Sequence, residues 1–183
     1  MSKINTPEDI LNFWFSEDVK PFWFKKNAEF DREIKQRFSN TYQLAKVGAL
    51  EAWCKTAEDI LALIIVLDQF PRNMFRNTPQ AFATDDQAVE LTKYAVARNF
   101  QQELSTKQQA FLYMPLMHSE SKADQAQCVE LFTNLGKEDN LKFAIKHREI
   151  IKRFGRFPHR NEILGRKSTL EEQKFLTQPG SSF

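Results

Sequence analysis

Chain-breaking residues are scarce in this sequence, which has only 5 Gly and 7 Pro among 183 residues. Leu, Ala, Glu, Lys and Gln are abundant, and all five are good helix formers. No stretch alternates apolar and polar residues for long enough to indicate a β-strand. With 42% hydrophobic and 27% charged residues, the composition is that of a globular protein rather than a disordered one. These features predict an all-α fold.

Long apolar runs are also missing. The longest aliphatic stretch, Ile60 to Leu67, is far shorter than the roughly 20 residues that a membrane-spanning helix needs. The first ten residues lack the basic and then apolar layout of a secretory signal. We therefore expect a cytoplasmic protein that has no membrane partner.

Motifs that would identify a cofactor or a common reaction are absent from the sequence. The two cysteines, Cys54 and Cys128, have no CxxC spacing, which excludes a disulfide framework and a zinc knuckle and predicts buried thiols. There is no HExxH, no GxSxG and no glycine-rich phosphate loop. We expect neither a metal site nor a cofactor.

Apolar residues recur every three or four positions along most of the chain, and capping residues stand where the periodic segments begin. At this length we expect one domain, residues 1–183, of about eight helices. Its last residues, 177–183, read as a flexible tail. The predicted helices cover Ile10–Phe15, Phe30–Ala45, Ile60–Phe70, Asp85–Val96, Gln108–His118, Asp124–Leu135, Leu141–Phe154 and a short segment after Thr169.

One polar segment, LDQFPRN, follows the most apolar predicted helix. It places Asp68 where an unpaired carboxylate would be costly to bury, so the carboxylate needs a partner. Arg72 lies four residues on, but Pro71 cannot donate to the Leu67 carbonyl, which predicts a kink or a helix end here. The segment fits a structural ion pair at a helix terminus, or a binding role.

A second proline lies in the segment FLYMPLMHSE, just before His118 and Glu120. Pro115 frees the Phe111 carbonyl in the same way as Pro71 frees that of Leu67. Two apolar helices that are disturbed by proline, each followed by ionisable residues, would form adjacent walls of one polar pocket. A histidine held by a nearby carboxylate is the commoner arrangement and does not need a metal.

The segment FGRFPHRN offers many hydrogen-bond donors within a short loop, namely those of Arg156, His159, Arg160 and Asn161. Such a loop suits a carboxylate or a phosphate. The same donors would equally satisfy internal carboxylates and helix-end carbonyls. Interleaved phenylalanines are also typical of single-strand nucleic-acid platforms, but a net charge of +2 does not favour nucleic-acid binding.

Positive charge is concentrated near the C-terminus. Residues 142–167 contain nine Lys or Arg and two acidic residues, which leaves the rest of the chain with an excess of negative charge. This basic segment would steer an anionic ligand inwards or complement the carboxylates of the body.

These segments resemble signatures of a bacterial family known as domain of unknown function 924. The resemblance rests on Leu67–Asn73, Tyr113–Glu120, Phe154–Asn161 and Leu164–Arg166 followed by Ser168-Thr169, and it covers about Ile10 to Leu176. Leu170 departs from the pattern, where proline is expected, and bears on a helix cap only. The resemblance implies a tetratricopeptide-like fold of stacked helical hairpins and no established activity.

We hypothesise that the three polar segments meet in one cleft that binds a small anionic molecule or peptide. The alternatives are an enzyme of hydrolase or other type that uses a histidine–carboxylate pair as acid and base, and a structural protein–protein scaffold. The sequence does not decide the ligand or the oligomeric state. The candidate ligand-binding residues are Asp68, Arg72, His118, Glu120, Arg156, His159, Arg160 and Asn161.

Overall fold

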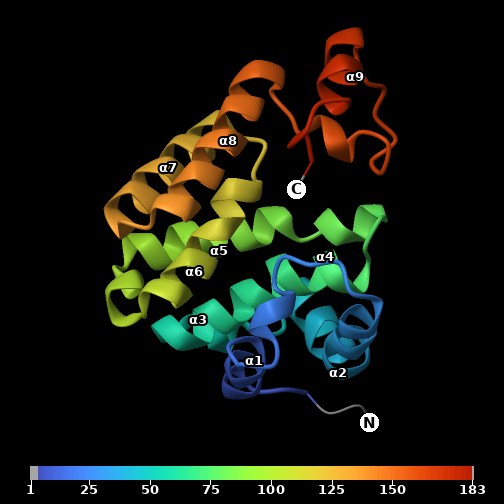
Figure 1. Cartoon of the computed structure of the whole chain (residues 1–183). Helices are drawn as coiled ribbons and strands as arrows, with labels where there is room; N and C mark the ends of the chain where they lie inside the picture. Colours follow the sequence, from blue (N-terminus) through green and yellow to red (C-terminus); the bar gives the residue numbers. More distant parts are fainter. Residues whose placement is uncertain (1–3, 183) are drawn as a thin grey trace.

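Helices make up the regular structure of the described part of this chain, residues 4–182 of a computed structural model (Figure 1). No strand occurs among these residues, as predicted. The α-helices are α1 (Pro7–Trp14), α2 (Ala28–Lys46), α3 (Ala57–Ile64), α4 (Phe70–Met74), α5 (Asp85–Ala97), α6 (Thr106–His118), α7 (Lys122–Leu135), α8 (Glu138–Phe154) and α9 (Leu170–Leu176).

Single turns of other helix types join these elements. Five are 3₁₀ turns, and the sixth, η3, is a π-helix. Because η3 connects α3 to α4 without a break, residues 57–74 form one continuous helix, and the described chain then has the eight helices that the sequence predicts. The connecting turns are η1 (Lys20–Phe22), η2 (Glu51–Cys54), η3 (Ile65–Gln69), η4 (Pro79–Phe82), η5 (Phe100–Glu103) and η6 (Pro158–Arg160).

Local capping explains why the helices begin where they do. Thr6, Ser105 and Thr169 each form a capping box, in which the side-chain oxygen accepts from the third backbone N–H of the helix. Gly136 and Gly155 end α7 and α8 in the left-handed conformation, which glycine adopts without strain. The helix ends that were predicted from capping residues are therefore confirmed to within a few residues.

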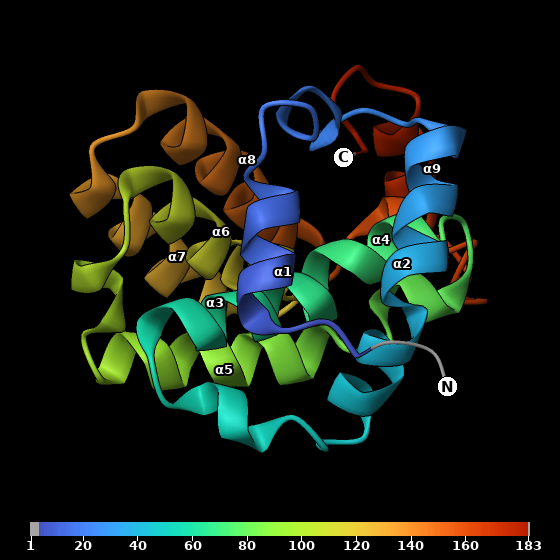
Figure 2. The ribbon, with the colours of Figure 1, turned by 90° about the horizontal axis from the view of Figure 1, so that it is seen from below.

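From α5 to α8 each helix packs against the next, whereas in the N-terminal half α1 packs on α3 and α2 packs on α4. The most extensive contacts join α7 to α8, α6 to α7 and α2 to α4, and α1 packs on α3 (Figures 1 and 2). In Figure 1, α8 and α9 lie at the opposite end of the molecule from α1 and α3. Whether the pairs form a tetratricopeptide-like array stays a prediction.

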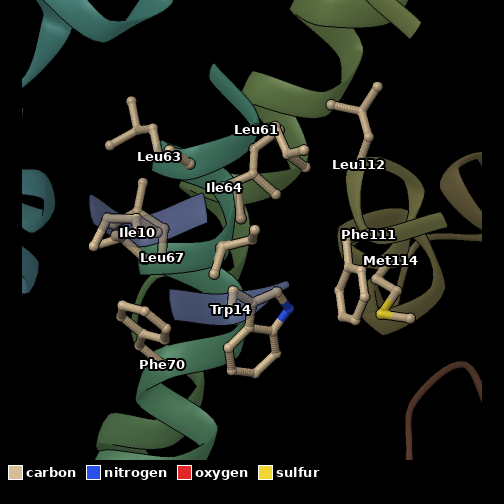
Figure 3. Packing of buried hydrophobic residues seen from close by; sticks show 14 of the residues in the cluster. Ile10, Trp14, Leu61, Leu63, Ile64, Leu67, Phe70, Phe111, Leu112 and Met114 are labelled. Carbon is tan, nitrogen blue, oxygen red and sulfur yellow. The ribbon is translucent and has the colours of Figure 1, made fainter. Parts of the chain in front are cut away.

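The core is centred on α3 and its π-helical continuation. Ile60, Ile64 and Phe70 are fully buried, and Trp14 of α1 and Phe111 of α6 pack around them (Figure 3). Of the aromatic residues in Phe13–Phe15 and Phe22–Phe24, all but one belong to this core or pack against it. Phe24 differs, since it is 75% exposed.

The helix does not end at Pro71, which corrects one of the two outcomes that the sequence predicted there. Residues 65–69 widen into a π-turn, and Pro71 lies just after this turn within the continuous helix. The Leu67 carbonyl, which lacks its usual donor, accepts instead from the hydroxyl of Thr84 at 2.5 Å. A third element therefore satisfies the group that proline leaves unpaired.

Two further features concern the ends of the chain and the membrane. Among residues 4–182, no helix is both long and apolar enough to cross a membrane. Residues 177–182, which we expected to be a flexible tail, turn back on α9, where the Ser181 hydroxyl donates to the Leu176 carbonyl at 3.1 Å. Phe183, the last residue of the expected tail, lies outside the described residues.

Candidate functional site

Asp68 lies inside the π-helical turn and is fully buried. A π-turn inserts one residue into a helix, so it changes the direction of the side chains on it, and such turns are frequent at functional sites. Here the turn directs Asp68 towards the C-terminal end of α6. His118, the last residue of α6, lies there.

Asp68 and His118 form a direct hydrogen bond. Asp68 Oδ1 and His118 Nδ1 are 2.7 Å apart, and the Gln69 side-chain amide donates to the other carboxylate oxygen at 2.5 Å. Burial opposes ionisation of Asp68, but its contacts with His118 and Arg72 outweigh burial and hold the pKa of this carboxyl well below its usual range. An ionised carboxylate only accepts, so His118 carries its proton on Nδ1 and donates it to Asp68.

Arg72 joins Asp68 to a second buried acid. Its Nη2 lies 3.4 Å from Asp68 Oδ1, the same oxygen that His118 contacts. Both terminal nitrogens also donate to Asp85, at 2.9 and 3.1 Å. A bidentate arginine–carboxylate pair is strong and fixes the orientation of both groups. Asp85 therefore holds Arg72 against the pair that Asp68 and His118 form.

Arg160 completes this network from the C-terminal side of the chain. It donates to Asp85 Oδ2 at 3.3 Å and to the His118 carbonyl at 3.0 Å. Its guanidinium also stacks 4.6 Å from the rings of Phe82 and Phe157. Burial and the neighbouring Arg72 lower the pKa of Arg160 to about 10, which leaves it charged at neutral pH. The network thus balances two arginines against two carboxylates.

One edge of the network reaches solvent. The side chains of His118 and Arg72 are 17% and 21% exposed, whereas that of Asp68 is 1% exposed. His118 Nε2 and Arg72 Nε make no hydrogen bond to any residue between 4 and 182. Neither atom is among the polar atoms in that range that are both buried and without a partner, so solvent reaches both of them. Burial, followed by the charge of Arg72, lowers the pKa of His118, so the ring is neutral at pH 7. Nε2 then has a free lone pair.

Glu120 and Asn161 belong to a neighbouring network. The Glu120 carboxylate accepts from both terminal nitrogens of Arg166, at 2.7 and 2.9 Å, and from the Phe157 backbone N–H at 2.7 Å. The Asn161 side chain accepts from Arg166 Nε at 2.9 Å and donates to Ser168. Burial opposes ionisation of Glu120, but these bonds lower its pKa. Glu120 and Asn161 therefore satisfy an internal arginine.

Arg156 pairs with Glu172 rather than with an acid of either network. Two of its nitrogens donate to Glu172 at 2.7 and 2.8 Å, and one of them also donates to the Lys167 carbonyl. Together with Arg160–Asp85 and Arg166–Glu120, this pair shows that the basic C-terminal segment largely complements carboxylates of the protein itself. The sequence suggested that this segment either steers an anionic ligand or complements carboxylates of the protein, and the second role accounts for these three arginines.

His159 and His147 lie near His118 on the C-terminal side. Burial and then Arg160 lower the pKa of His159 to about 4, and burial lowers that of His147 to about 3. The His147 ring makes an edge contact with Phe157, and Nδ1 lies 2.8 Å from the Phe143 carbonyl oxygen. His159 was predicted as a site residue from the sequence, and His147 was not.

A hollow of about 350 Å³ adjoins the second network, between α5 and the start of α7. Glu120 borders it, but Asp68 and His118 do not. Lys93 is the cation of the lining and already contacts Glu90 and Asp124. The hollow thus suits a cation better than an anion. Its full lining is Asp86, Val89, Glu90, Lys93, Ser119, Glu120, Ser121 and Asp124.

The sequence missed three participants, namely Asp85, Arg166 and Gln69. Asp85 stands in the first turn of α5, where an acidic residue is common because it complements the helix dipole. Nothing in the neighbouring sequence distinguishes an acidic residue that only complements the helix dipole from one that forms a buried ion pair. Arg166 is 46 residues from Glu120 in sequence, so only the folded chain reveals their pairing.

Comparisons with known proteins agree with this architecture. A solved structure, that of a protein of unknown function, ATU0120, from Agrobacterium tumefaciens, has a TM-score of 0.88 to this chain and 40% sequence identity, covering 93% of this chain and 96% of that one. No curated protein matches the chain. The model of a family described as "Bacterial protein of unknown function" (DUF924) matches residues 10–180. The chain therefore belongs to the DUF924 family.

Proposed function

We propose that this protein binds a small anionic molecule where His118 and Arg72 meet at the surface, and that His118 acts there as a general acid or base. The observation that carries the proposal is the contact of both side chains with one oxygen of the buried Asp68 carboxylate. That contact fixes the histidine and the arginine side by side. Each retains a nitrogen without a partner among the described residues.

The chemistry follows from the protonation states. Asp68 orients the imidazole and holds the proton on Nδ1, so neutral His118 offers its Nε2 lone pair to a proton of the ligand. Asp68 would then stabilise the imidazolium that forms. Arg72 keeps its charge and would hold an anionic group of the ligand through Nε–H, next to the reacting nitrogen. This combines the ligand-binding and enzyme hypotheses that the sequence suggests.

One observation favours the structural scaffold instead. Asp85, Glu120 and Glu172 already occupy the guanidinium groups of Arg160, Arg166 and Arg156. Internal charge pairs of this kind hold parts of a fold in place and need no ligand to account for them. In the scaffold alternative, a change at His118 would alter stability alone. The same experiment therefore separates the two.

The test is a thermal-shift screen of the purified protein with inorganic phosphate and a panel of small mono- and dicarboxylates. A ligand at 100 times its Kd adds about 2.7 kcal/mol to stability, which for a chain of this size corresponds to a rise in Tm of about 5 °C or more. We expect such a hit. His118→Gln and Arg72→Lys should each abolish the rise, and Arg148→Lys, an arginine on the outer part of α8, should keep it.

Acid–base action is checked by following the hit compound by NMR with the native protein and with His118→Gln. Turnover that needs His118 supports the full proposal. Binding without turnover reduces it to a binding site. If no anion raises the Tm, or if the two variants respond like the native protein, the scaffold alternative is preferred.

A further inference from the structure

Side chains from outside α6 hold its last turn, which carries His118. The final carbonyl groups of a helix have no N–H donor within that helix. Here the side-chain amide of Gln125, near the start of α7, donates to three carbonyls of the turn, and Arg160 donates to the carbonyl of His118 at 3.0 Å. The three carbonyls that Gln125 binds are those of Leu116, Met117 and Ser119, at 3.2, 2.7 and 2.8 Å. Four successive carbonyls at this helix end are therefore occupied.

Within residues 4–182, the Gln125 side chain binds no other polar group. The side chain is fully buried, and its Oε1 makes no hydrogen bond in that range. Buried side-chain oxygens normally have a partner, so this one indicates that another requirement sets the direction of the amide. Turning the amide over would aim Oε1 at three carbonyl oxygens, which would repel it. The amide is thus committed to the end of α6.

These carbonyls matter to His118 because they form the negative end of the α6 dipole. A helix C-terminus attracts cations and favours the protonated form of a histidine that lies there. The amide hydrogens of Gln125 and the guanidinium of Arg160 bring positive charge to the same oxygens. His118 therefore lies at a helix end whose negative charge is largely offset.

We propose that Gln125 is a positioning residue for His118. It fixes the backbone on both sides of the histidine and offsets the negative end of α6, so that the imidazole stays neutral and able to accept a proton. The catalytic meaning of this role rests on the proposed function, but the effect on the imidazole does not. Gln125 is uncharged, so its replacement leaves in place every charged or titratable group that faces His118. Those groups are Asp68, Arg72, Asp85, His147 and Arg160.

The test follows the imidazole of His118 by NMR through a pH titration of the native protein and of Gln125→Met. Methionine has nearly the size of glutamine but no donor. The chain has three histidines, and the spectrum of His118→Gln identifies the signal of this one. We expect the titration midpoint of His118 to rise by about one pH unit in Gln125→Met, a tenfold gain in proton affinity, because the helix end regains its negative charge.

Thr92→Val is the matched control for lost stability. The Thr92 hydroxyl is also fully buried and also donates to a carbonyl of α6, that of Leu112, at 2.8 Å. Leu112 lies more than one turn before His118, away from the end of the helix. Both variants should therefore unfold at lower denaturant concentration, since each lacks a buried donor to α6. Only Gln125→Met should change the titration of His118.

Several outcomes would overturn the proposal. One is a His118 midpoint that is unchanged in Gln125→Met, or an imidazole that stays neutral in this variant until acid unfolds it. Another is an equal rise in Thr92→Val, which would make the effect a general result of lower stability. If Gln125→Met does not fold, Gln125→Asn takes its place, because its shorter side chain draws the amide back from the carbonyls. A midpoint like that of the native protein would then count against the role of Gln125.

This inference and the proposed function can fail separately. The titration needs no ligand, so a raised midpoint with no anion bound in the thermal screen contradicts only the proposed function. An anion that needs His118 for binding, together with an unchanged midpoint in Gln125→Met, contradicts only the role of Gln125. For a compound that is turned over, the acidic limb of kcat/KM should move to higher pH in Gln125→Met by the same amount as the midpoint.

Discussion

All three histidines of this chain lie near one another, and their burial makes stability sensitive to acid. The pKa of His147 falls to about 3 in the folded state, below the value of about 6.5 in an unfolded chain. The unfolded state thus binds more protons below pH 6.5, so stability decreases as the pH falls. Above about pH 7 the same group has no effect.

We expect His147 alone to reduce the free energy of unfolding by roughly 2–3 kcal/mol between pH 7 and about pH 4.5. His159, whose pKa falls to about 4, adds to the loss. Urea unfolding at a series of pH values measures the decrease, and His147→Phe should make the curve shallower. If the free energy of unfolding of the native protein stays constant down to pH 4.5, the histidines are not buried as described.

The sequence identified the polar residues of the site better than their partners. The structure brings together Asp68, Arg72, His118 and Arg160, as the sequence suggested. Two prolines and a glycine-containing loop mark the ends of the segments that carry these residues. Arg156 lies in the same loop but turns to Glu172. Spacing along a loop does not determine the direction in which each side chain points. That direction depends on the acidic residue, distant in sequence, with which the side chain pairs.

At the scale of single elements, the continuous helix of residues 57–74 depends on a group outside it. Pro71 leaves the Leu67 carbonyl without its usual donor, and the buried Thr84 hydroxyl supplies one. Proline and the capping residues can be recognised in the sequence, so both the helix and an irregularity near Pro71 were predicted. The π-turn was not, since it depends on Thr84 and His118, which lie 17 and 50 residues away from the groups that they contact.

Thr84→Val tests this dependence, because valine has the shape of threonine without the hydroxyl. We expect a loss of about 1–3 kcal/mol in the free energy of unfolding, the cost of a buried carbonyl without a partner. Chemical denaturation measures it. The control is Thr133→Val, an exposed position on α7 whose hydroxyl donates to the Val129 carbonyl, where the change should stay within about 0.5 kcal/mol. Equal effects at both positions would contradict the argument.

At the scale of the whole molecule, the main core is held by aromatic side chains from well-separated helices. Phe70 contacts the rings of Phe13, Trp14 and Phe38, with ring centres 4.7 to 6.4 Å apart. Aromatic pairs at such distances contribute beyond the area that they bury. The periodicity of apolar residues predicted which faces are buried, but the order in which the helices stack required contacts between distant parts of the chain.

Phe70→Ala should therefore reduce the free energy of unfolding by about 3–5 kcal/mol, as expected for an aromatic side chain removed from a packed core. Differential scanning calorimetry, with Leu170→Ala as the comparison, measures the change. Leu170 is 77% exposed, so its truncation should have little effect. A small loss at Phe70 would mean that the core can collapse around the missing ring.

The wide separation between Asp85 and Arg160 along the chain has a consequence for biosynthesis. While a ribosome is still making the segment that contains Arg160, the helices that contain Asp68 and Asp85 are already outside the exit tunnel, and domains fold as units once enough chain has emerged. Arg72 is then the only arginine of the first network available to these two acids. The nascent chain would remain incompletely neutralised until Arg160 emerges, so the fold around these two acids should close only after that point.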